Sequence, residues 1–464
     1  MLQIHQMAAD LFEAAVGAYG QGDFSAASTF ARAAMQAVPT APASNLAGLA
    51  EFSRGNHEEG VALVQRAAAL DPANAEYPNN LGFMFHARGD FERARDALNL
   101  ALALDPAMAS AANNLGSVLE KLGDDAAAIV CYRRALRIDP AFVEARDNLL
   151  LACAKAAPQW HFPMMADLPR NQAYADALAR VAAGRRVLDI GTGSGLLAMM
   201  AARAGAAHVT ACEMQPVIAG LAQAVITAND MTSQVEVWAM KSTDLGAGRE
   251  LPARAEVLVT ETFASGLLSE GVLPTVEDAH QRLLTPGAVV IPRRAAAVGY
   301  LIGGPLIEQH LFAQRWGELD LSPFDLLAPS KVGLHLDRVP HEALSDDFEI
   351  FGFDLTDRQF PSERRRLQVP ATRAGRCVGV AQWIKLDLDA ISAYENRPTA
   401  KAGPNGWMHV VYPFARPVDV VPGNLVPLAL SHNRMNIAIG LDEADAWAPP
   451  VAAPEKSHTG PGLP

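Results

Sequence analysis

The sequence contains little cysteine. Its 464 residues include four cysteines, Cys131, Cys153, Cys212 and Cys377, and none lies at metal-ligand spacing from another. So few scattered thiols cannot form the disulfide framework of a small secreted domain, and they do not indicate a zinc site. We therefore expect no metal and a reducing, cytoplasmic location.

Positive charge is also scarce. The chain has 38 basic and 51 acidic residues, a formal net charge of −13. An acidic protein is a poor electrostatic match for a phosphate backbone, so we expect no nucleic-acid partner. A basic partner fits the charge better.

Long apolar runs are absent as well. No stretch reaches the length that a membrane span requires, and the first residues lack the basic start and apolar core of a signal peptide. We expect no membrane association. The last residues, 447–464, are rich in proline, glycine and alanine, which predicts a disordered tail.

The first third of the chain is repetitive. Asp-Pro pairs recur at a step of 34 residues, at Asp71, Asp105 and Asp139, and Leu-Gly pairs share that step at Gly82 and Gly116. Each unit predicts a helix that ends at a glycine turn and an amphipathic helix that stops before proline. The pattern resembles the tetratricopeptide repeat family and predicts a solenoid with a capping helix over residues 4–157.

A solenoid of this kind presents a groove. Concave faces of solenoids commonly bind partners, so we expect a protein or peptide in the repeat groove. A scaffold or dimer contact is the alternative.

The middle third alternates short apolar strands with helices. The strand 186–190, the helix 196–202 and the strand 208–212 follow one another, and further strands are predicted at 234–238 and 257–260. This order is typical of a doubly wound parallel sheet, here over residues 158–294.

A glycine-rich turn follows the first of these strands. It contains Gly191, Gly193 and Gly195, with Asp189 two residues before it and Glu213 at the end of the next strand. A carboxylate in the Glu213 position can accept both hydroxyls of a ribose. An acidic Asp189 would repel the pyrophosphate of a dinucleotide but not a sulfonium, so a methyltransferase is favoured over a dehydrogenase.

Three segments resemble the protein arginine methyltransferases, most nearly the branch with N-terminal tetratricopeptide repeats, protein arginine methyltransferase 9. VLDIGTGSGLLAMMAARAGAAHVTACE is similar to motif I and its successor, and VTETFASGLLSEGVLPTVEDAHQRLL resembles the active-site loop. Residues 160–174 look like the family's cofactor lid. The resemblance covers about residues 160–441 and implies S-adenosyl-L-methionine as the cofactor and an arginine-containing protein as the substrate.

Two glutamates frame the expected active site. Glu261 ends a predicted strand, and Glu270 follows across a glycine-containing loop. A guanidinium between two carboxylates would relieve their repulsion and be oriented for methyl transfer, so both are assigned as catalytic. The alternative for Glu270 is a solvated loop residue.

The resemblance also implies further roles. Asp189 and the three glycines would line the methionine end of the cofactor and Glu213 its ribose. Ser242 or Thr243 would contact the adenine, Arg170 the cofactor carboxylate, and His161 would lie near the ribose. Met164, Met165 and Trp407 would surround the arginine. For Met165, plain packing in the core is an equally good interpretation.

The last third is rich in strands. Alternating and apolar segments between residues 295 and 446 fit the β-barrel that follows the sheet domain in the family. The insert 315–327 lies where the family connects to its dimerisation arm, so a homodimer is a further expectation. The whole chain is therefore predicted to be a multidomain α+β protein.

The match departs from the family at two places. Gly406 stands where the family has a histidine, which leaves Asp167 without its usual partner, and Ala264 replaces an aspartate of the active-site loop. These changes leave two alternatives open. One is a repeat-based interaction protein with a vestigial methyltransferase domain, and the other is a methyltransferase for a different small or protein substrate. The product pattern also stays open.

Overall fold

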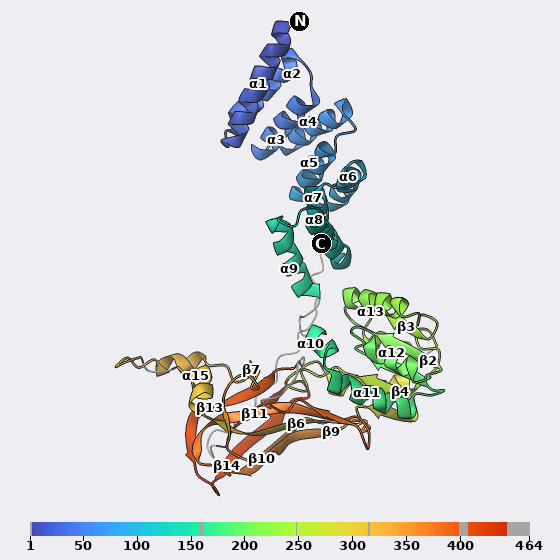
Figure 1. Ribbon diagram of the computed structural model, residues 1–464, viewed down its shortest axis with the longest axis vertical. Helices are drawn as coiled ribbons and strands as arrows, with labels where there is room; N and C mark the ends of the chain where they lie inside the picture. The colour runs from blue at the N-terminus through green and yellow to red at the C-terminus, as the bar shows by residue number, and fades with distance from the viewer. Residues whose placement is uncertain (1, 157–160, 247, 314–315, 399–406, 443–464) are drawn as a thin grey trace, which may run out of the picture. The chain divides into compact units, whose positions relative to one another are not determined.

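A computed structural model describes residues 2–156, 161–246, 248–313, 316–398 and 407–442. The chain divides into two compact units, 1–158 and 159–464 (Figure 1). The predicted disordered tail, 447–464, lies outside the described residues. Among the helices that are described, none combines the length and the apolar character needed to cross a membrane.

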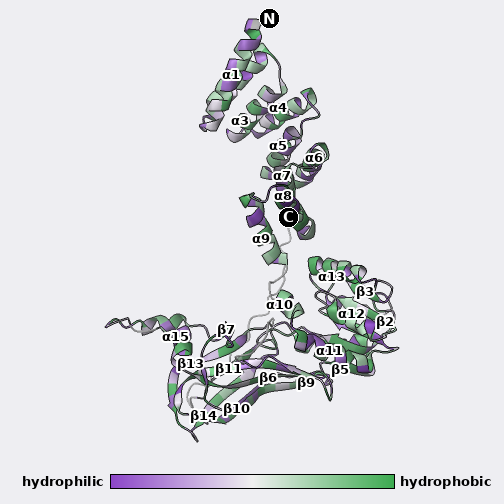
Figure 2. Cartoon of the chain, in the orientation of Figure 1, coloured by the Kyte–Doolittle hydropathy of each residue, from purple (hydrophilic) through white to green (hydrophobic). Residues whose placement is uncertain are grey.

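The first unit is entirely helical over its described residues. Its helices are α1 Leu2–Gly20, α2 Phe24–Ala37, α3 Ala41–Ser53, α4 His57–Leu70, α5 Glu76–Ala87, α6 Phe91–Leu104, α7 Ala109–Lys121, α8 Asp125–Ile138 and α9 Val143–Ala156. Consecutive helices pack in pairs, and each carries both hydrophobic and hydrophilic residues (Figure 2). The predicted tetratricopeptide solenoid is confirmed.

The repeat turns and the helix pairing both depend on glycine. The turn residues Gly55 and Gly89 have φ of 91° and 79°, in the left-handed region that other residues rarely adopt. In α5, a Cβ placed on Gly82 would lie 2.4 Å from Leu98 Cγ of α6. The hydrogen side chain of Gly82 therefore permits the close approach of the two helices.

The second unit begins with a parallel sheet in the order β3-β2-β1-β4-β5. Its strands are β1 Arg186–Ile190, β2 His208–Cys212, β3 Val235–Trp238, β4 Ala255–Thr260 and β5 Leu284–Ile291, and its helices are α10 His161–Met165, α11 Leu168–Val181, α12 Leu196–Arg203, α13 Pro216–Ala228 and α14 Val272–Asp278, with the short η1 Ser242–Asp244 and the π-helical η2 Ala279–Leu283. The predicted doubly wound domain is confirmed.

Antiparallel strands follow. They are β6 Arg294–Gly303, β7 Val332–Leu334, β8 Glu342–Ala343, β9 Phe348–Asp354, β10 Glu363–Pro370, β11 Gly375–Asp387, β12 Ala393–Glu395, β13 His409–Val420, β14 Leu425–His432 and β15 Ile437–Leu441, with α15 Pro305–Leu311 and η3 Ser322–Leu327 between β6 and β7. One sheet has the order β7-β13-β11-β6-β8, and β10-β14-β15 form another. This β domain is the antiparallel part that the sequence predicts.

One hydrophobic core joins the parallel sheet to the β domain. It contains Val257 and Leu258 of β4 together with Ile384 of β11 and Leu428 of β14, all fully buried. The β domain is thereby fixed against the sheet, so side chains from both can contribute to one site.

Replacing Gly82 by alanine tests the helix pairing. The added methyl overpacks against Leu98, and we expect the repeat unit to lose about 1–3 kcal/mol of unfolding free energy. The measurement is denaturant unfolding of the full chain followed by helical circular dichroism. Gly17→Ala is the matched control, because no atom lies within 4 Å of its Cβ, and it gains up to about 1 kcal/mol. Equal effects of both substitutions would contradict the packing account.

Candidate active site

The carboxyl ends of three neighbouring strands bring acidic residues together. Ile190 of β1 pairs with Cys212 of β2 and with Thr260 of β4. Glu213 and Glu261 directly follow β2 and β4, and Asp189 is the penultimate residue of β1. The edge where the parallel strands end therefore carries three carboxylates, at the position where open α/β sheets bind their ligands.

The glycine turn lies between these carboxylates. Gly191, Gly193 and Gly195 have φ of 75°, 54° and 81°, so each occupies the left-handed region. Gly195 is also the N-cap of α12. The turn therefore needs glycines, and it leads directly into α12.

Asp189 is fully buried below the turn. Its Oδ2 accepts a hydrogen bond from Thr192 Oγ1 at 2.6 Å. Oδ1 has no hydrogen bond of good geometry among the described residues, although the nearby Ala198 N–H favours the charged form. Burial raises the pKa of Asp189 to about 7, and the negative Glu213 adds to the shift.

Glu213 closes the other side of the turn. Its Oε2 accepts from Gly193 N at 3.3 Å and its Oε1 from Gln215 N at 2.9 Å. A Cβ on Gly193 would lie 3.8 Å from His161 Cε1, so the first residue of α10 covers the turn. Asp189, Glu213, Gly193 and His161 thus form one cradle.

This cradle fits S-adenosyl-L-methionine. A buried carboxylate with an oxygen that lacks a hydrogen bond suits a cationic group, and Glu213 retains lone pairs for ribose hydroxyls. The predicted adenine residues differ in burial. Ser242 in η1 is buried and Thr243 is exposed, so Ser242 is the better placed of the two.

Arg170 of α11 forms a buried ion pair with Glu261. Its Nη2 donates to Glu261 Oε2 at 2.5 Å, and the two side chains are 4% and 5% exposed. The guanidinium carbon also lies 5.2 Å from the centre of the Tyr174 ring. The sequence places Arg170 at the cofactor carboxylate, and the structure adds that it is already bound to a glutamate of the predicted catalytic pair.

The two predicted catalytic glutamates differ in environment. Burial raises the pKa of Glu261 to about 7, Arg170 opposes this, and the negative charges of Glu270 and Asp189 add to it. Glu270 reaches solvent, but partial desolvation and the charge of Glu213 raise its pKa too. Glu270 has no hydrogen bond or ion pair with any residue that the structure describes. The two carboxylates lie close enough for the negative charge of Glu270 to raise the pKa of Glu261.

The loop between the glutamates is held by the β domain. Trp407 Nε1 donates to Phe263 O at 2.8 Å, and Met408 N donates to Ser265 Oγ at 3.0 Å. Gln382 of β11 contacts Ser265 O as well, at 3.4 Å. The buried Trp407 therefore lies in the hydrophobic core and against the active-site loop, and its role as a wall of the substrate pocket stays a prediction.

The structure corrects one sequence expectation. Asp167 is expected to lack a partner because Gly406 replaces the family's histidine, yet Tyr394 Oη of β12 donates to Asp167 Oδ2 at 2.5 Å. Gly406 itself lies outside the described residues. The sequence carries no local signal for this contact, because 227 residues separate its partners.

The two methionines lie on the lid helix. Met164 is half-buried and Met165 is 37% exposed, both in α10. Met164 is thus the better candidate for a wall of the arginine pocket, and the exposure of Met165 argues against core packing.

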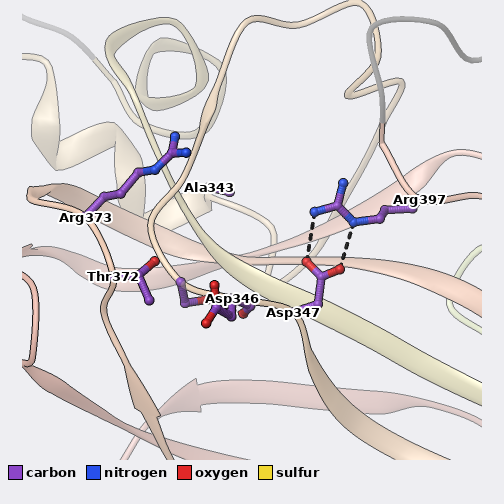
Figure 3. A pocket seen from close by; sticks show the side chains of 7 residues that line it. Ala343, Asp346, Asp347, Thr372, Arg373 and Arg397 are labelled. Atoms are coloured by element: carbon purple, nitrogen blue, oxygen red, sulfur yellow. Dashed lines mark hydrogen bonds and ion pairs between the residues drawn. The ribbon is translucent and has the colours of Figure 1, made fainter.

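A separate hollow of about 320 Å³ lies in the β domain (Figure 3). It is lined by Ala343, Ser345, Asp346, Asp347, Thr372, Arg373 and Arg397. Arg397 donates to both carboxylate oxygens of Asp347, at 2.7 and 3.0 Å, and its guanidinium lies 5.6 Å from the Trp383 ring. Trp383 and Gln382 are adjacent in β11 and face opposite sides of the sheet. The hollow is therefore not part of the candidate active site.

No group of three histidine, cysteine, aspartate or glutamate side chains within the described ranges has a geometry that could hold a metal ion.

Comparison with known proteins gives two family matches. Residues 174–291 match a model described as ribosomal protein L11 methyltransferase, and residues 71–141 match a tetratricopeptide repeat model. Together with the parallel sheet, the glycine turn and its carboxylates, the first match indicates a methyltransferase that uses S-adenosyl-L-methionine.

Related sequences indicate which family of methyltransferases the chain belongs to. An arginine N(omega)-methyltransferase of Streptomyces achromogenes subsp. streptozoticus is 35% identical over 286 residues, 61% of this chain and 79% of the relative. Protein arginine N-methyltransferase 7 of Drosophila yakuba is 31% identical over 322 residues, 59% of this chain and 46% of the relative. The chain thus spans less than half the length of that second relative. It belongs to the arginine N-methyltransferase family, and the resemblance predicted from the sequence is confirmed.

Solved structures agree on the fold. The Trypanosoma brucei PRMT1 enzyme–prozyme heterotetrameric complex with AdoHcy has a TM-score of 0.53 at 20% identity, covering 62% of this chain and 95% of that chain. Arabidopsis thaliana protein arginine methyltransferase 10 has a TM-score of 0.50 at 21% identity, covering 60% and 88%.

The raised pKa of Glu261 predicts the pH dependence of methyl transfer. Only the ionised carboxylate attracts a guanidinium, so kcat/KM should rise with pH, with a midpoint near 7, as Glu261 loses its proton. The measurement is kcat/KM between pH 5.5 and 9 with an arginine substrate. A profile that is flat across this range would contradict the prediction.

Proposed function

We propose that the protein methylates the guanidinium of arginine within a polypeptide, with that group held between Glu261 and Glu270. The observation that carries this proposal is the Arg170 ion pair, in which Glu261 Oε2 already binds a guanidinium. Glu261 Oε1 has no hydrogen bond to another described residue, so it is available to a second guanidinium. Glu270, which also has no such partner, would bind from the other side.

Charge balance supports the same proposal. Asp189, Glu213, Glu261 and Glu270 interact electrostatically with one another. Arg170 is the one lysine or arginine that is buried within the described ranges. Because uncompensated carboxylates are costly in a partly buried site, this group of carboxylates favours cationic ligands.

The reaction follows from what the residues hold. When bound, S-adenosyl-L-methionine supplies a methyl group on a positively charged sulfur, which is electrophilic. Glu261 and Glu270 orient one terminal guanidinium nitrogen toward the cradle formed by Asp189 and Glu213. Their negative charges draw the guanidinium's positive charge toward the bound nitrogens and so raise the nucleophilicity of the attacking one.

The proton released by the methylated nitrogen needs an acceptor. Glu261 is buried and bound to Arg170, whereas Glu270 reaches solvent and has no described partner. Glu270 is thus better placed to take the proton and pass it to water. Its raised pKa brings it closer to neutrality, where a carboxylate is a more effective base.

Neutral replacements of the two glutamates test this proposal. Glu261→Gln and Glu270→Gln should each lower kcat by about a hundredfold or more, in the range for a lost acid–base or positioning group. For Glu270→Gln, affinity for S-adenosyl-L-methionine, measured by calorimetry, should stay within a few-fold of the unmodified protein. Glu236→Gln is the control, since it removes the same charge from the partly exposed face of β3. Near-normal transfer in either test variant would contradict the two-glutamate arrangement.

Free arginine is the second candidate acceptor. The name of the Streptomyces relative gives arginine itself, while the Drosophila name gives protein arginine. The two are distinguished by supplying the enzyme with methyl-labelled cofactor and either free arginine or arginine-containing polypeptides. Transfer to free arginine alone would favour the second candidate.

The repeat unit supports a polypeptide acceptor. Side-chain amides link the first helices of consecutive repeats, from Asn80 to Asn45, Asn114 to Asn79 and Asn148 to Asn113, each at 3.0 Å. Each amide keeps further donors and acceptors. We define these six residues as the amide row, and we propose that it binds the backbone of a docked chain.

Kinetics with substrates of different length test the docking role. The double variant Asn80→Ala/Asn114→Ala should raise KM for polypeptides of 30 or so residues by about tenfold, the effect of one or two lost hydrogen bonds. It should not change KM for free arginine or for a short peptide. Asn74→Ala, whose side chain bonds its own loop, is the control. An equal change for long and short substrates would contradict docking by the repeats.

Family membership and the intact set of carboxylates favour an enzyme over the interaction protein with a vestigial domain. The homodimer, the cytoplasmic location and the degree of methylation stay predictions. The described part of the insert exposes apolar side chains, including Trp316 at 76% and Phe324 at 71%, as a contact arm would.

A further inference from the structure

Tyr394 joins the β domain to Asp167, the residue that caps α11. It lies in the short strand β12, which pairs with β11, and its side chain is 8% exposed. Its hydroxyl donates to Asp167 Oδ2 at 2.5 Å. A hydrogen bond from a neutral donor to a buried carboxylate is stronger than one between neutral groups.

Asp167 also forms a hydrogen bond with the helix that follows, α11. Its other oxygen, Oδ1, accepts from Arg170 N at 3.1 Å and caps α11. The side chain of Arg170 then forms the ion pair with Glu261. One carboxylate thus joins β12 to the first turn of α11, and that turn carries the cation facing the catalytic pair.

Tyr394 also packs against Trp407. Its ring centre lies 5.6 Å from that of Trp407, at an interplanar angle of 45°. Trp407 donates to Phe263 O in the loop between the glutamates. Tyr394 therefore touches both the lid and the residue that supports the active-site loop.

We infer that Tyr394 is a positioning residue for methyl transfer: its bond to Asp167 holds the first turn of α11 closed, with Arg170 against Glu261, while Arg180 and Asp389 hold the other end of the helix. It does so where the resemblance places a histidine, which this chain replaces by Gly406. The cofactor cradle depends on the position of Asp167 as well, because α10, which begins with His161, lies just before Asp167 in the chain. Loss of the Tyr394 hydroxyl should therefore loosen the lid and weaken the cradle.

The charged groups around Glu261 determine how a displaced lid would change the pKa of Glu261. The groups that face it are Arg170 and Tyr174 from α11, Asp189 from β1, Glu270 from the loop and Tyr394 itself from β12. Of these, only Arg170 favours the ionised carboxylate. Displacing α11 therefore raises the pKa of Glu261 and moves the acidic limb of kcat/KM to higher pH.

The test variant is Tyr394→Phe in the full chain, with three readouts. Amide hydrogen exchange in residues 168–174 should become faster without any ligand. The Kd for S-adenosyl-L-methionine should rise about tenfold, as expected for one lost hydrogen bond to a charged group. The acidic limb of kcat/KM should move upward, a readout that depends on the proposed function.

Tyr300→Phe is the matched control. Tyr300 is also a buried tyrosine of the β domain, and its hydroxyl bonds His341 Nε2 at 2.6 Å in a separate hydrophobic cluster. Its loss should lower thermal stability without changing exchange in α11, cofactor affinity or the pH limb. If both variants change these readouts alike, or if Tyr394→Phe changes none of them, the positioning role is wrong.

A double-mutant cycle assigns the effect to the bond itself. Asp167→Ser can still cap α11 but is too short to reach Tyr394. Combined with Tyr394→Phe, it should weaken cofactor binding no further than the stronger single variant. Additive losses would overturn the inference. Because exchange and cofactor affinity need no methyl acceptor, failure to methylate arginine would refute the proposed function alone.

Discussion

The buried ion pair between Arg170 and Glu261 is the contact on which the rest of the site depends. Removing one partner from such a pair typically costs about 3–5 kcal/mol, because the other charge is left uncompensated. Here the carboxylate stands near Asp189 and Glu270, so its compensation matters more than in an isolated pair. The pair favours the charged form of the glutamate and joins α11 to the end of β4.

The position of that ion pair explains why the β domain is needed beside the parallel sheet. The sheet alone brings Asp189, Glu213 and Glu261 to one edge, since parallel strands end together. The lid helix and the active-site loop are held from the other side, by Tyr394 on Asp167 and by Trp407 on Phe263. The shared hydrophobic core fixes these two sides against each other.

Much of the fold could be predicted because its signals are local. The strand 186–190 is a buried apolar run that ends at a glycine turn, and the structure has β1 at the same residues. Gly82 repeats with the period of the solenoid, and its lack of a side chain is needed for packing on Leu98. Asp189 and Glu213 could be assigned because each lies at a strand end.

Contacts between distant segments were harder to predict. Asp167 and Tyr394 are brought together only by packing of the β domain on the lid, and β12 has three residues and no distinctive pattern. The pairing of Arg170 with Glu261 spans 91 residues, whereas the family resemblance assigns the arginine a different partner, the cofactor. Spacing along the chain could place both glutamates at the candidate active site but could not show which one is buried.

The most direct test is a crystal structure of the full chain with S-adenosylhomocysteine and an arginine-containing peptide. We expect the substrate guanidinium to lie between the carboxylates of Glu261 and Glu270, while Arg170 stays bound to Glu261. A guanidinium bound elsewhere, or glutamate side chains that point apart with no cavity between them, would contradict it.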